Sequence, residues 1–292
     1  MSSRPDPRAG DLVSDIVRTA AAEMESTHRP MLEDVPDGLH QHRTRVRRLR
    51  SVLAGFRGSL DEPAVERLRV LYAEWGRQLG VARDVEVLAA AAEKALEARG
   101  IADGPAFERL VDEPRAEYAR AHARLVEMSD LRRARERARL LAHFVGDLRV
   151  TDADSDAGLL VSTVLRHEAR RVRRRARERD GTDATVHALR KAGRRLRYIA
   201  EAVAAAAPDL HAAEVSALAE AGDAVHDRLG AYRDAHTFAA AVRRHAVLAG
   251  RAGEPTDVYD DIERSTLEDI GAEPPALAEP LARIREARRA LG

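Results

Sequence analysis

The chain contains 292 residues, of which 45% are hydrophobic, 34% charged and 3% aromatic. This length is enough for two domains, and the scarcity of aromatic residues disfavours a β-sandwich or barrel and favours helices packed through Ala, Leu and Val. The absence of cysteine excludes disulfides, thiol catalysis and cysteine-ligated metals, and no apolar run approaches the roughly 20 residues of a membrane span. Because the first residues also lack an apolar secretory segment, we expect a soluble cytoplasmic protein that does not enter a membrane.

Apolar periodicity predicts helices throughout the first half of the chain. An apolar stripe begins at Leu12, and Asp37 stands at the N-cap position of a strongly basic helix expected over residues 38–56. Pro63 opens a further helix in its first turn, and a separate alanine-rich helix is expected over residues 81–98. The basic helix is expected to bury four apolar side chains: Val46, Leu49, Val52 and Leu53.

The second half repeats this plan after a linker, residues 147–158, in which small and acidic residues replace the helical periodicity. Thr182 or Asp183 stands where a cap is needed before a second basic helix, and a tail helix is expected over residues 276–290. No segment alternates with period two for long enough to form a convincing strand, so the sequence predicts an all-α fold. Breaks between helices are expected at Gly181, at Pro208 and around residues 250–255.

Three sequence markers recur in the same order about 150 residues later, which indicates an internal duplication. We therefore predict two homologous domains, residues 1–146 and 159–292, each a bundle of four or more antiparallel helices, packed as a pseudo-symmetric pair. The repeated markers are LVSDIVR at 12–18 with LVSTVLR at 160–166, LHQHRTRVRRLR at 39–50 with VHALRKAGRRLR at 186–197, and LGVARD at 79–84 with LGAYRD at 229–234.

The formal net charge is zero, but the charges are unevenly placed. Only two of the 49 basic residues are lysines, a bias that codon usage in a GC-rich genome can explain. Codon usage does not explain placement, because four segments hold 23 of the 49 basic residues and only 3 of the 49 acidic ones. Such local fields attract anions. The segments are residues 39–50, 131–140, 166–179 and 186–198.

Helical spacing arranges many of these cations in two rows. Each row falls on one helix face about 80° wide and roughly 15 Å long. Like charges one turn apart destabilise a helix by roughly 0.2–0.5 kcal/mol per pair, and neither segment contains Asp or Glu to relieve this. The first row is His40, Arg43, Arg47 and Arg50, flanked by Arg48; the second row is His187, Arg190, Arg194 and Arg197, flanked by Lys191 and Arg195.

Two kinds of group could neutralise the rows. Acidic residues of neighbouring helices, such as Asp84 and Asp234, could form interhelical ion pairs with them. Alternatively, an extended polyanion could lie along both rows, since a guanidinium holds two phosphate oxygens at once and stays charged at neutral pH. If the duplicated halves face each other, the rows form a central basic groove or pore that fits a long anion.

The two basic helices resemble a known family. The signature of the conserved histidine α-helical domain, CHAD, resembles residues 186–203, VHALRKAGRRLRYIAEAV, and more loosely residues 39–56, LHQHRTRVRRLRSVLAGF. The second signature of that family, in which a Leu-Gly turn precedes an Arg-Asp pair, resembles residues 79–88, LGVARDVEVL, and residues 229–238, LGAYRDAHTF. The resemblance covers nearly the whole chain and includes the duplication.

The resemblance implies an all-α fold of two pseudo-symmetric four-helix bundles whose basic surfaces meet in a central groove or pore. It also implies non-enzymatic binding of inorganic polyphosphate without cofactor or metal, at polyphosphate granules, and a polyphosphate-metabolising enzyme as a partner. Asp84 and Asp234 are expected to orient arginines by ion pairing. By position, the expected polyphosphate contacts are His40, Arg43, Arg47, Arg48, Arg50, Arg83, His187, Arg190, Lys191, Arg194, Arg195, Arg197 and Arg233.

Two further features bear on this site. A histidine beside phosphate becomes a cationic donor as the pH falls through a reference pKa of about 6.5, so His40 and His187 are expected to strengthen binding at mildly acidic pH. A second arginine stripe is either an extension of the anion path or a solvated face, whereas the arginines within residues 132–139 face several directions and are expected at the surface. The second stripe is Arg166, Arg170, Arg173, Arg174 and Arg177.

Three other functions compete with polyphosphate binding. A phosphate-processing metalloenzyme is disfavoured, because there is no HExxH or GxxxxGK[ST] motif and His226-Asp227 is expected to be a helix-surface pair. Nucleic-acid binding is the stronger competitor, since a basic stripe accepts any phosphate chain, although few aromatic residues are available to stack on bases. A structural scaffold or protein adaptor is the third alternative.

Overall fold

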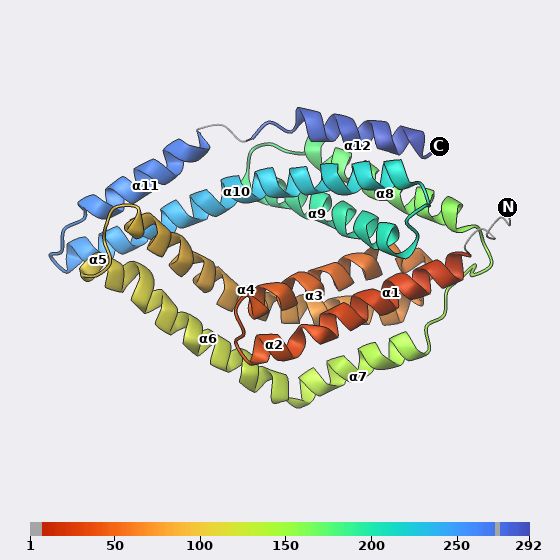
Figure 1. Ribbon diagram of the computed structural model, residues 1–292, viewed down its shortest axis with the longest axis horizontal. Coiled ribbons are helices and arrows are strands. Elements are labelled where there is room, and N and C mark those ends of the chain that lie inside the picture. Colours follow the sequence, from red (N-terminus) through yellow and green to blue (C-terminus); the bar gives the residue numbers. More distant parts are fainter. Residues whose placement is uncertain (1–7, 272–274) are drawn as a thin grey trace. The chain divides into compact units, whose positions relative to one another are not determined.

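The computed structural model describes residues 8–271 and 275–292, and most of these residues are helical (Figure 1). Within these ranges no β-strand forms, and only two isolated bridges occur, which confirms the predicted all-α class. In the same ranges, no helix is both long enough and apolar enough to cross a membrane. The elements are α1 (Ala9–Ser26), α2 (His28–Leu32), α3 (Gly38–Gly55), η1 (Arg57–Ser59), α4 (Glu62–Glu97), α5 (Pro105–Phe107), η2 (Glu108–Asp112), α6 (Glu113–Asp130), α7 (Arg132–Gly146), α8 (Ala157–Arg177), α9 (Asp183–Ala206), α10 (Ala212–Arg251), α11 (Asp257–Ile270) and α12 (Ala278–Ala290).

These helices pack as two compact units, and each unit draws on both halves of the sequence. The larger unit comprises the described residues of Met1–Gly76, Leu131–Arg228 and Ala276–Gly292, and the smaller unit those of Arg77–Asp130 and Leu229–Pro275. Helices α4 and α10 each contribute residues to both units. This division follows packing, whereas the domains predicted from the repeat follow sequence similarity and stay a prediction.

Helices α3 and α9 form the centre of the larger unit. Helix α9 packs against α1, α3 and α8, while α3 also packs against α1 and α2. Their apolar faces supply the core. The four side chains predicted to face the core from α3 are all buried, and α9 buries a matching set: Leu189, Leu196, Ile199 and Val203.

Two glycines let α9 and α10 approach closely within the larger unit. A Cβ atom added to Gly222 would lie 2.9 Å from the carbonyl oxygen of Gly193 and 3.0 Å from the backbone nitrogen of Arg197. Both atoms belong to a helix backbone, which cannot move aside as a flexible side chain would. The absence of side chains at Gly193 and Gly222 therefore sets the distance between the second row and α10.

A buried histidine connects α3 with α4 and with the end of α1. The side chain of His42 is fully buried, and its Nε2 accepts a hydrogen bond from Nε1 of Trp75 at 3.0 Å. This leaves Nδ1 as the protonated nitrogen, and it lies 3.0 Å from Oγ1 of Thr27. Thr27 in turn donates to the carbonyl oxygen of Met24 at 2.9 Å. The polar side-chain atoms of Trp75, His42 and Thr27 therefore all have a hydrogen-bond partner while His42 is neutral.

One arginine of α7 has a structural position that the sequence did not indicate. Arg137 lies over the ring of Trp75, with its guanidinium carbon 4.5 Å from the ring centroid, and also over Tyr72 at 5.7 Å. Such cation–π contacts stabilise the packing of α7 on α4. The surface expectation holds for the other arginines of this run, which are exposed: Arg132, Arg133, Arg135 and Arg139.

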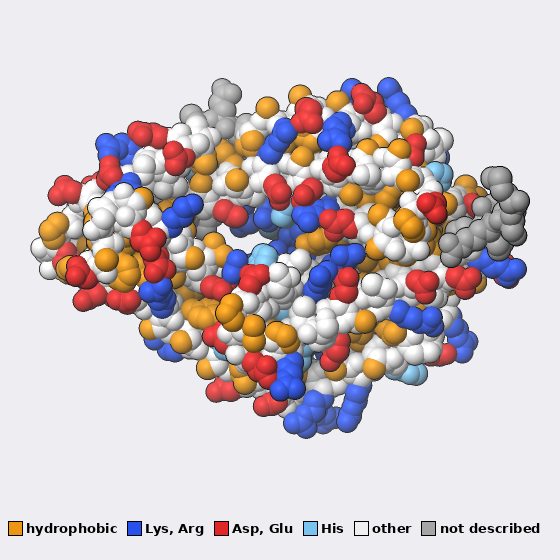
Figure 2. Space-filling model, viewed as in Figure 1, with side chains coloured by type: hydrophobic (Ala, Val, Ile, Leu, Met, Phe, Trp, Pro, Cys, Tyr) orange, Lys and Arg blue, Asp and Glu red, His pale blue; other side chains and the backbone are white. Residues whose placement is uncertain are grey.

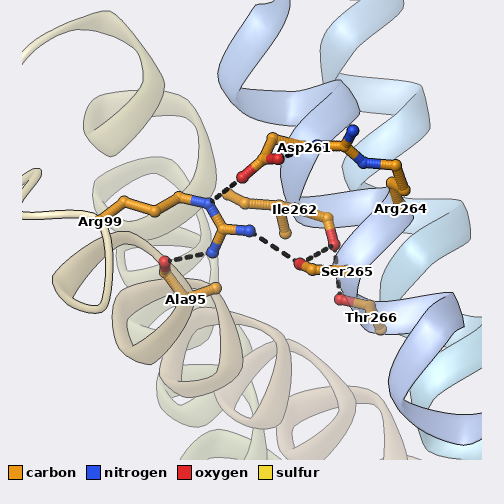
Figure 3. A network of polar contacts seen from close by, with 7 residues as sticks. All are labelled: Ala95, Arg99, Asp261, Ile262, Arg264, Ser265 and Thr266. Carbon is orange, nitrogen blue, oxygen red and sulfur yellow. Dashed lines mark hydrogen bonds and ion pairs between the residues drawn. The ribbon is translucent and has the colours of Figure 1, made fainter.

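A cluster of buried apolar residues and a polar network stabilise the smaller unit. The network centres on Arg99, which donates from Nε to Asp261 at 2.8 Å, from Nη1 to the carbonyl of Ala95 and from Nη2 to Ser265 (Figure 3). Asp261 is also paired with Arg264. The end of α4 is thereby fixed to α11. The apolar cluster is Ala92, Leu96, Leu110, Val111, Val242, Ala249, Tyr259 and Ile262.

The structure corrects the predicted break between residues 79 and 81. Helix α4 runs without interruption, so the Leu-Gly pair at residues 79–80 lies inside a helix, and so does the pair at 229–230 in α10. The expected Leu-Gly turn is therefore wrong. Glycine costs a helix interior only about 1 kcal/mol relative to alanine, and the burial of Leu79, Ala82 and Leu229 on either helix outweighs this cost.

Two predicted caps occupy the right position but do not cap through their side chains. Asp37 precedes α3 with a positive φ of 63°, and its carboxylate accepts from the side chain of Gln41 instead. Thr182 precedes α9, and its hydroxyl donates to Asp180 at 2.7 Å. Asp156 does cap α8, accepting from the backbone of Leu159 at 2.6 Å.

Candidate anion-binding site

The two rows of cations meet, because α3 packs directly against α9. Arg47 of α3 is half-buried and lies within electrostatic reach of Arg194 and Arg190 of α9, as well as of Arg43 on its own helix. Burial, followed by the charges of Arg194 and Arg43, lowers the pKa of Arg47 to about 9. Arg47 therefore remains a cation at neutral pH, held in a strongly positive environment.

Arg194 occupies the equivalent position in the second row. Burial lowers its pKa to about 10, with further lowering by the charges of Arg190, Arg43 and Arg50. Tyr198 partly offsets this effect at both Arg47 and Arg194. Among the residues that the structure describes, no carboxylate forms an ion pair with either of these arginines. The positive charges of Arg47 and Arg194 are therefore concentrated where α3 packs on α9.

The remaining residues of the rows differ in exposure. Arg43, Arg50 and Arg190 are half-buried, and so are the two histidines, His40 and His187. Lys191 is exposed at the border of the second row. Guanidinium groups at this density can bind several phosphate oxygens along a chain, with each fork holding two of them.

Among the predicted contacts in the larger unit, carboxylate partners are found for Arg48, Arg195 and Arg197. Arg48 lies 3.6 Å from Glu23 of α1, and Arg195 donates to the buried Glu168 of α8 and to the carbonyl of Ala54. Arg197 pairs with Glu201 on its own helix and with Asp223 of α10. Carboxylates thus neutralise the flanking Arg48 and Arg195 and one member of the second row, Arg197. The carboxylates are Glu23, Glu168, Glu201 and Asp223. The ion pairing expected of Asp84 and Asp234 stays a prediction.

Two predicted contacts belong to the smaller unit. Arg83 forms an ion pair with Glu86, one turn further along α4, at 2.8 Å. Arg233 lies half-buried in α10. Because both residues are outside the unit that contains the rows, their contact with the same ligand stays a prediction.

A histidine of α10, which the sequence indicated only as a surface residue, adjoins the second row. The His226 side chain is only 14% exposed, and its Nδ1 lies 3.0 Å from Asp227. Burial, then the charge of Arg190, lowers the pKa of His226 to about 4. The surface expectation is therefore wrong for His226, although Asp227 is exposed. His226 lies one turn after Gly222, where α10 approaches α9 closely, and the sequence pattern does not reveal this approach.

His226 also belongs to the one group of potential metal ligands found among the described residues. Asp223, His226 and Asp227 offer three ligand atoms within 4.8 Å of one another. However, Arg197 is already bound to Asp223, and the charges of Arg190 and Arg194 reach His226. This positive surrounding opposes a cation and favours an anion at the same place.

The surface of the protein contrasts with the rows. The face drawn in Figure 2 carries acidic and basic side chains interspersed, in keeping with the zero net charge. Most arginines outside the rows that have a partner pair with a carboxylate on the same or a neighbouring helix, for example Arg109 with Glu254 at 2.6 Å. Local excess of positive charge is therefore a feature of particular helices and not of the whole surface.

The fold and these rows define an all-α protein with arginine-rich helices packed side by side. The chain belongs to the CHAD domain family, which matches residues 15–243. Among solved structures, the CHAD domain from the plant Ricinus communis superposes with a TM-score of 0.72 at 21% identity, covering 98% of this chain and 94% of that one. PptA from Streptomyces chartreusis superposes with a TM-score of 0.67 at 20% identity, covering 97% and 99%. These likenesses show the fold.

Two curated relatives come from Mycobacterium tuberculosis. They are the uncharacterized proteins MT2285 of strain CDC 1551 / Oshkosh and Rv2226 of strain ATCC 25618 / H37Rv. Each is 29% identical over 267 residues, which make up 87% of this chain and 49% of the relative. The chain therefore spans about half the length of the curated relatives that it matches.

Proposed function

We propose that this protein binds inorganic polyphosphate along the two rows and does not catalyse its turnover. The observation that supports this most directly is the pair Arg47 and Arg194. They come from different helices, lie in one electrostatic environment and have no carboxylate partner among the described residues. A phosphate chain supplies a negative charge at every unit, so it can neutralise both rows at once. Membership of the CHAD family is consistent with this ligand.

The central test is charge reversal at that pair. Arg47→Glu with Arg194→Glu should abolish retention on immobilised polyphosphate while leaving the helical circular-dichroism spectrum unchanged. The matched control is Arg132→Glu with Arg139→Glu, which makes the same change in net charge at two exposed positions of α7. Retention that survives in the first variant, or is lost equally in the control, would contradict the assignment of the rows.

Nucleic acid is the alternative that a competition assay separates. Few aromatic side chains adjoin the rows, so base stacking, worth about 1–3 kcal/mol per base, contributes little. Long-chain polyphosphate should therefore displace RNA or single-stranded DNA from the protein far better than the reverse. The affinity should also fall steeply with salt, with a log–log slope of about −0.7 per phosphate engaged.

The absence of turnover is tested separately. Incubation of polyphosphate with the protein and Mg²⁺ or Mn²⁺ should release no inorganic phosphate above a protein-free control. Release that disappears in Asp223→Asn would instead favour the metalloenzyme, because Asp223 belongs to the one potential metal-ligand group among the described residues. In the cell, we place the protein in the cytoplasm at polyphosphate granules, together with a polyphosphate-metabolising enzyme; a fluorescent fusion that stays diffuse when granules form would oppose this.

A further inference from the structure

A second concentration of arginines lies on α8 and α12, which pack against each other in the larger unit. Four arginines of α8 follow i, i+4, i+7 and i+11 spacing, which places them on one face about 60° wide over roughly 16 Å. Three more occur within one turn of α12. We call this set the α8–α12 surface; it consists of Arg166, Arg170, Arg173 and Arg177 of α8 with Arg285, Arg288 and Arg289 of α12.

The arginines of the two helices face one another across their contact. The charges that act on Arg173 come from Arg177 on the same helix and from Arg288, Arg285 and Arg289 of α12. Burial, and then these charges, lowers the pKa of Arg173. The packing of α12 on α8 therefore creates one continuous patch from two arginine stripes. The sequence indicated only the α8 stripe.

Carboxylates do not neutralise this surface. In the described parts of the chain, none of its seven arginines forms an ion pair. Glu168 of α8 is paired with Arg195, and Glu178, the residue after α8, is paired with Arg174 and Arg175. On α12, Glu279 pairs with Arg228 of α10, and only the exposed Glu286 lies among the arginines. The helices therefore carry repulsion that an anion from solution would relieve.

The chemistry of the two helices favours a bare phosphate chain over other polyanions. Neither α8 nor α12 contains Phe, Tyr or Trp, so nothing on them could stack on a base. Their apolar faces are buried in the core, and Leu159 is the single large apolar side chain exposed on either helix. A lipid surface or a protein partner would need more apolar contact than this.

We infer that the α8–α12 surface is a second docking surface for polyphosphate, separate in position from the two rows. This inference rests on the proposed function. One long chain can engage the rows and the α8–α12 surface together, and the second contact then forms at a high effective concentration. A short chain can occupy only one of them at a time. The protein should therefore prefer long chains.

Calorimetric titrations with tripolyphosphate and with long-chain polyphosphate test this. Arg173→Glu with Arg288→Glu should weaken long-chain binding at least tenfold and reduce the salt slope by about 1.4, at about 0.7 for each phosphate that is no longer engaged. Tripolyphosphate should still bind to the rows of this variant with an affinity within twofold of the wild type. The milder pair Arg173→Gln with Arg177→Gln should change the long-chain affinity in the same direction without charge reversal at the helix contact.

Two comparisons separate this inference from the proposed function. The row variant, Arg47→Glu with Arg194→Glu, should bind too weakly for retention on immobilised polyphosphate, but calorimetry should still detect weak tripolyphosphate binding, which the added Arg173→Glu and Arg288→Glu remove. If the row variant alone abolishes all binding, or if the α8–α12 variants match the Arg132→Glu, Arg139→Glu control, the second surface is overturned while the rows stand. If the α8–α12 variants lose binding only to RNA or to anionic lipid vesicles, polyphosphate is not the ligand of the α8–α12 surface. If neither the row nor the surface variants lose polyphosphate binding, the proposed function itself fails.

Discussion

The buried histidine of α3 should make the larger unit sensitive to acid. His42 accepts a hydrogen bond from Trp75 through Nε2, and this bond is possible only while that nitrogen is unprotonated. Burial, followed by the positive charges of His28 and Arg137, lowers the pKa of His42 from 6.5 to about 3. At pH 5 the folded protein therefore keeps His42 neutral, whereas the unfolded chain binds a proton there.

The size of this effect follows from the difference in proton uptake. Above about pH 6.5 the lowered pKa of His42 does not change the free energy of unfolding, because His42 is then neutral in both the folded and the unfolded protein. Below it, each pH unit lowers the free energy of unfolding by about 1.4 kcal/mol until the pH nears the folded pKa of about 3. The contribution of His42 to the loss at pH 5 is therefore about 2 kcal/mol, a large fraction of the stability of most domains.

The single tryptophan provides the assay, because Trp75 is the hydrogen-bond partner of His42. Urea unfolding followed by tryptophan fluorescence at pH 7.5, 6 and 5 should show a shallower pH dependence in His42→Gln than in the wild type. The variant is expected to be less stable than the wild type at pH 7.5, since packing is lost. Its free energy of unfolding should, however, fall less than that of the wild type on acidification. His143→Gln, at an exposed position of α7, should keep the wild-type dependence. Equal dependence in the wild type and His42→Gln would refute the reasoning.

Three further predictions concern the helix contacts and the ligand. Gly222→Val should lower the free energy of unfolding by about 1–3 kcal/mol, because its side chain would meet the backbone of α9, whereas Gly58→Val, in open space, should change it little in the same fluorescence assay. Glu168→Gln should lower the free energy of unfolding by about 3 kcal/mol or more in thermal or urea unfolding, since it leaves the guanidinium of Arg195 buried without its carboxylate. A loss of free energy as small as that caused by breaking an exposed ion pair would contradict this. Polyphosphate affinity should rise as the pH falls from 7.5 to 6, and the double variant His40→Ala, His187→Ala should give a flat profile by calorimetry; a wild-type profile that is already flat would remove the role given to these histidines.

Much of the helical framework could be predicted from local sequence. The apolar spacing of α1 and α3 correctly identified their buried faces, because a 3.6-residue period leaves little choice of which side meets the core. The failures occurred where tertiary packing outweighs a local signal. The glycines at 80 and 230 looked like helix ends, but buried neighbours keep α4 and α10 continuous through them. Asp37 and Thr182 have capping side chains whose oxygens are engaged elsewhere.

The site could be predicted less completely, for a similar reason. Helical spacing alone placed Arg47 and Arg194 in rows, and the packing of α3 on α9 brings the two together. Helical spacing could not show that Arg195 is paired with Glu168, because that ion pair joins two helices whose packing no local pattern encodes. His226 lies one turn after Gly222, beside a close helix contact that no local pattern encodes, and the α12 part of the second surface depends on where the tail helix packs.

Concentrating arginines on α3 and α9 is possible because their opposite faces bury large apolar side chains. Each fully buried Leu, Val or Ile contributes about 1.5–3 kcal/mol, whereas a pair of like charges one turn apart costs only about 0.2–0.5 kcal/mol. Helix α3 buries Leu49, Val52 and Leu53 completely, so its core face outweighs the repulsion along its row several times over. The rows therefore do not need an anion in order to fold. An anion that binds them instead adds stability to a framework that already holds the charges in place, and this is the preorganisation that makes binding of a flexible chain favourable.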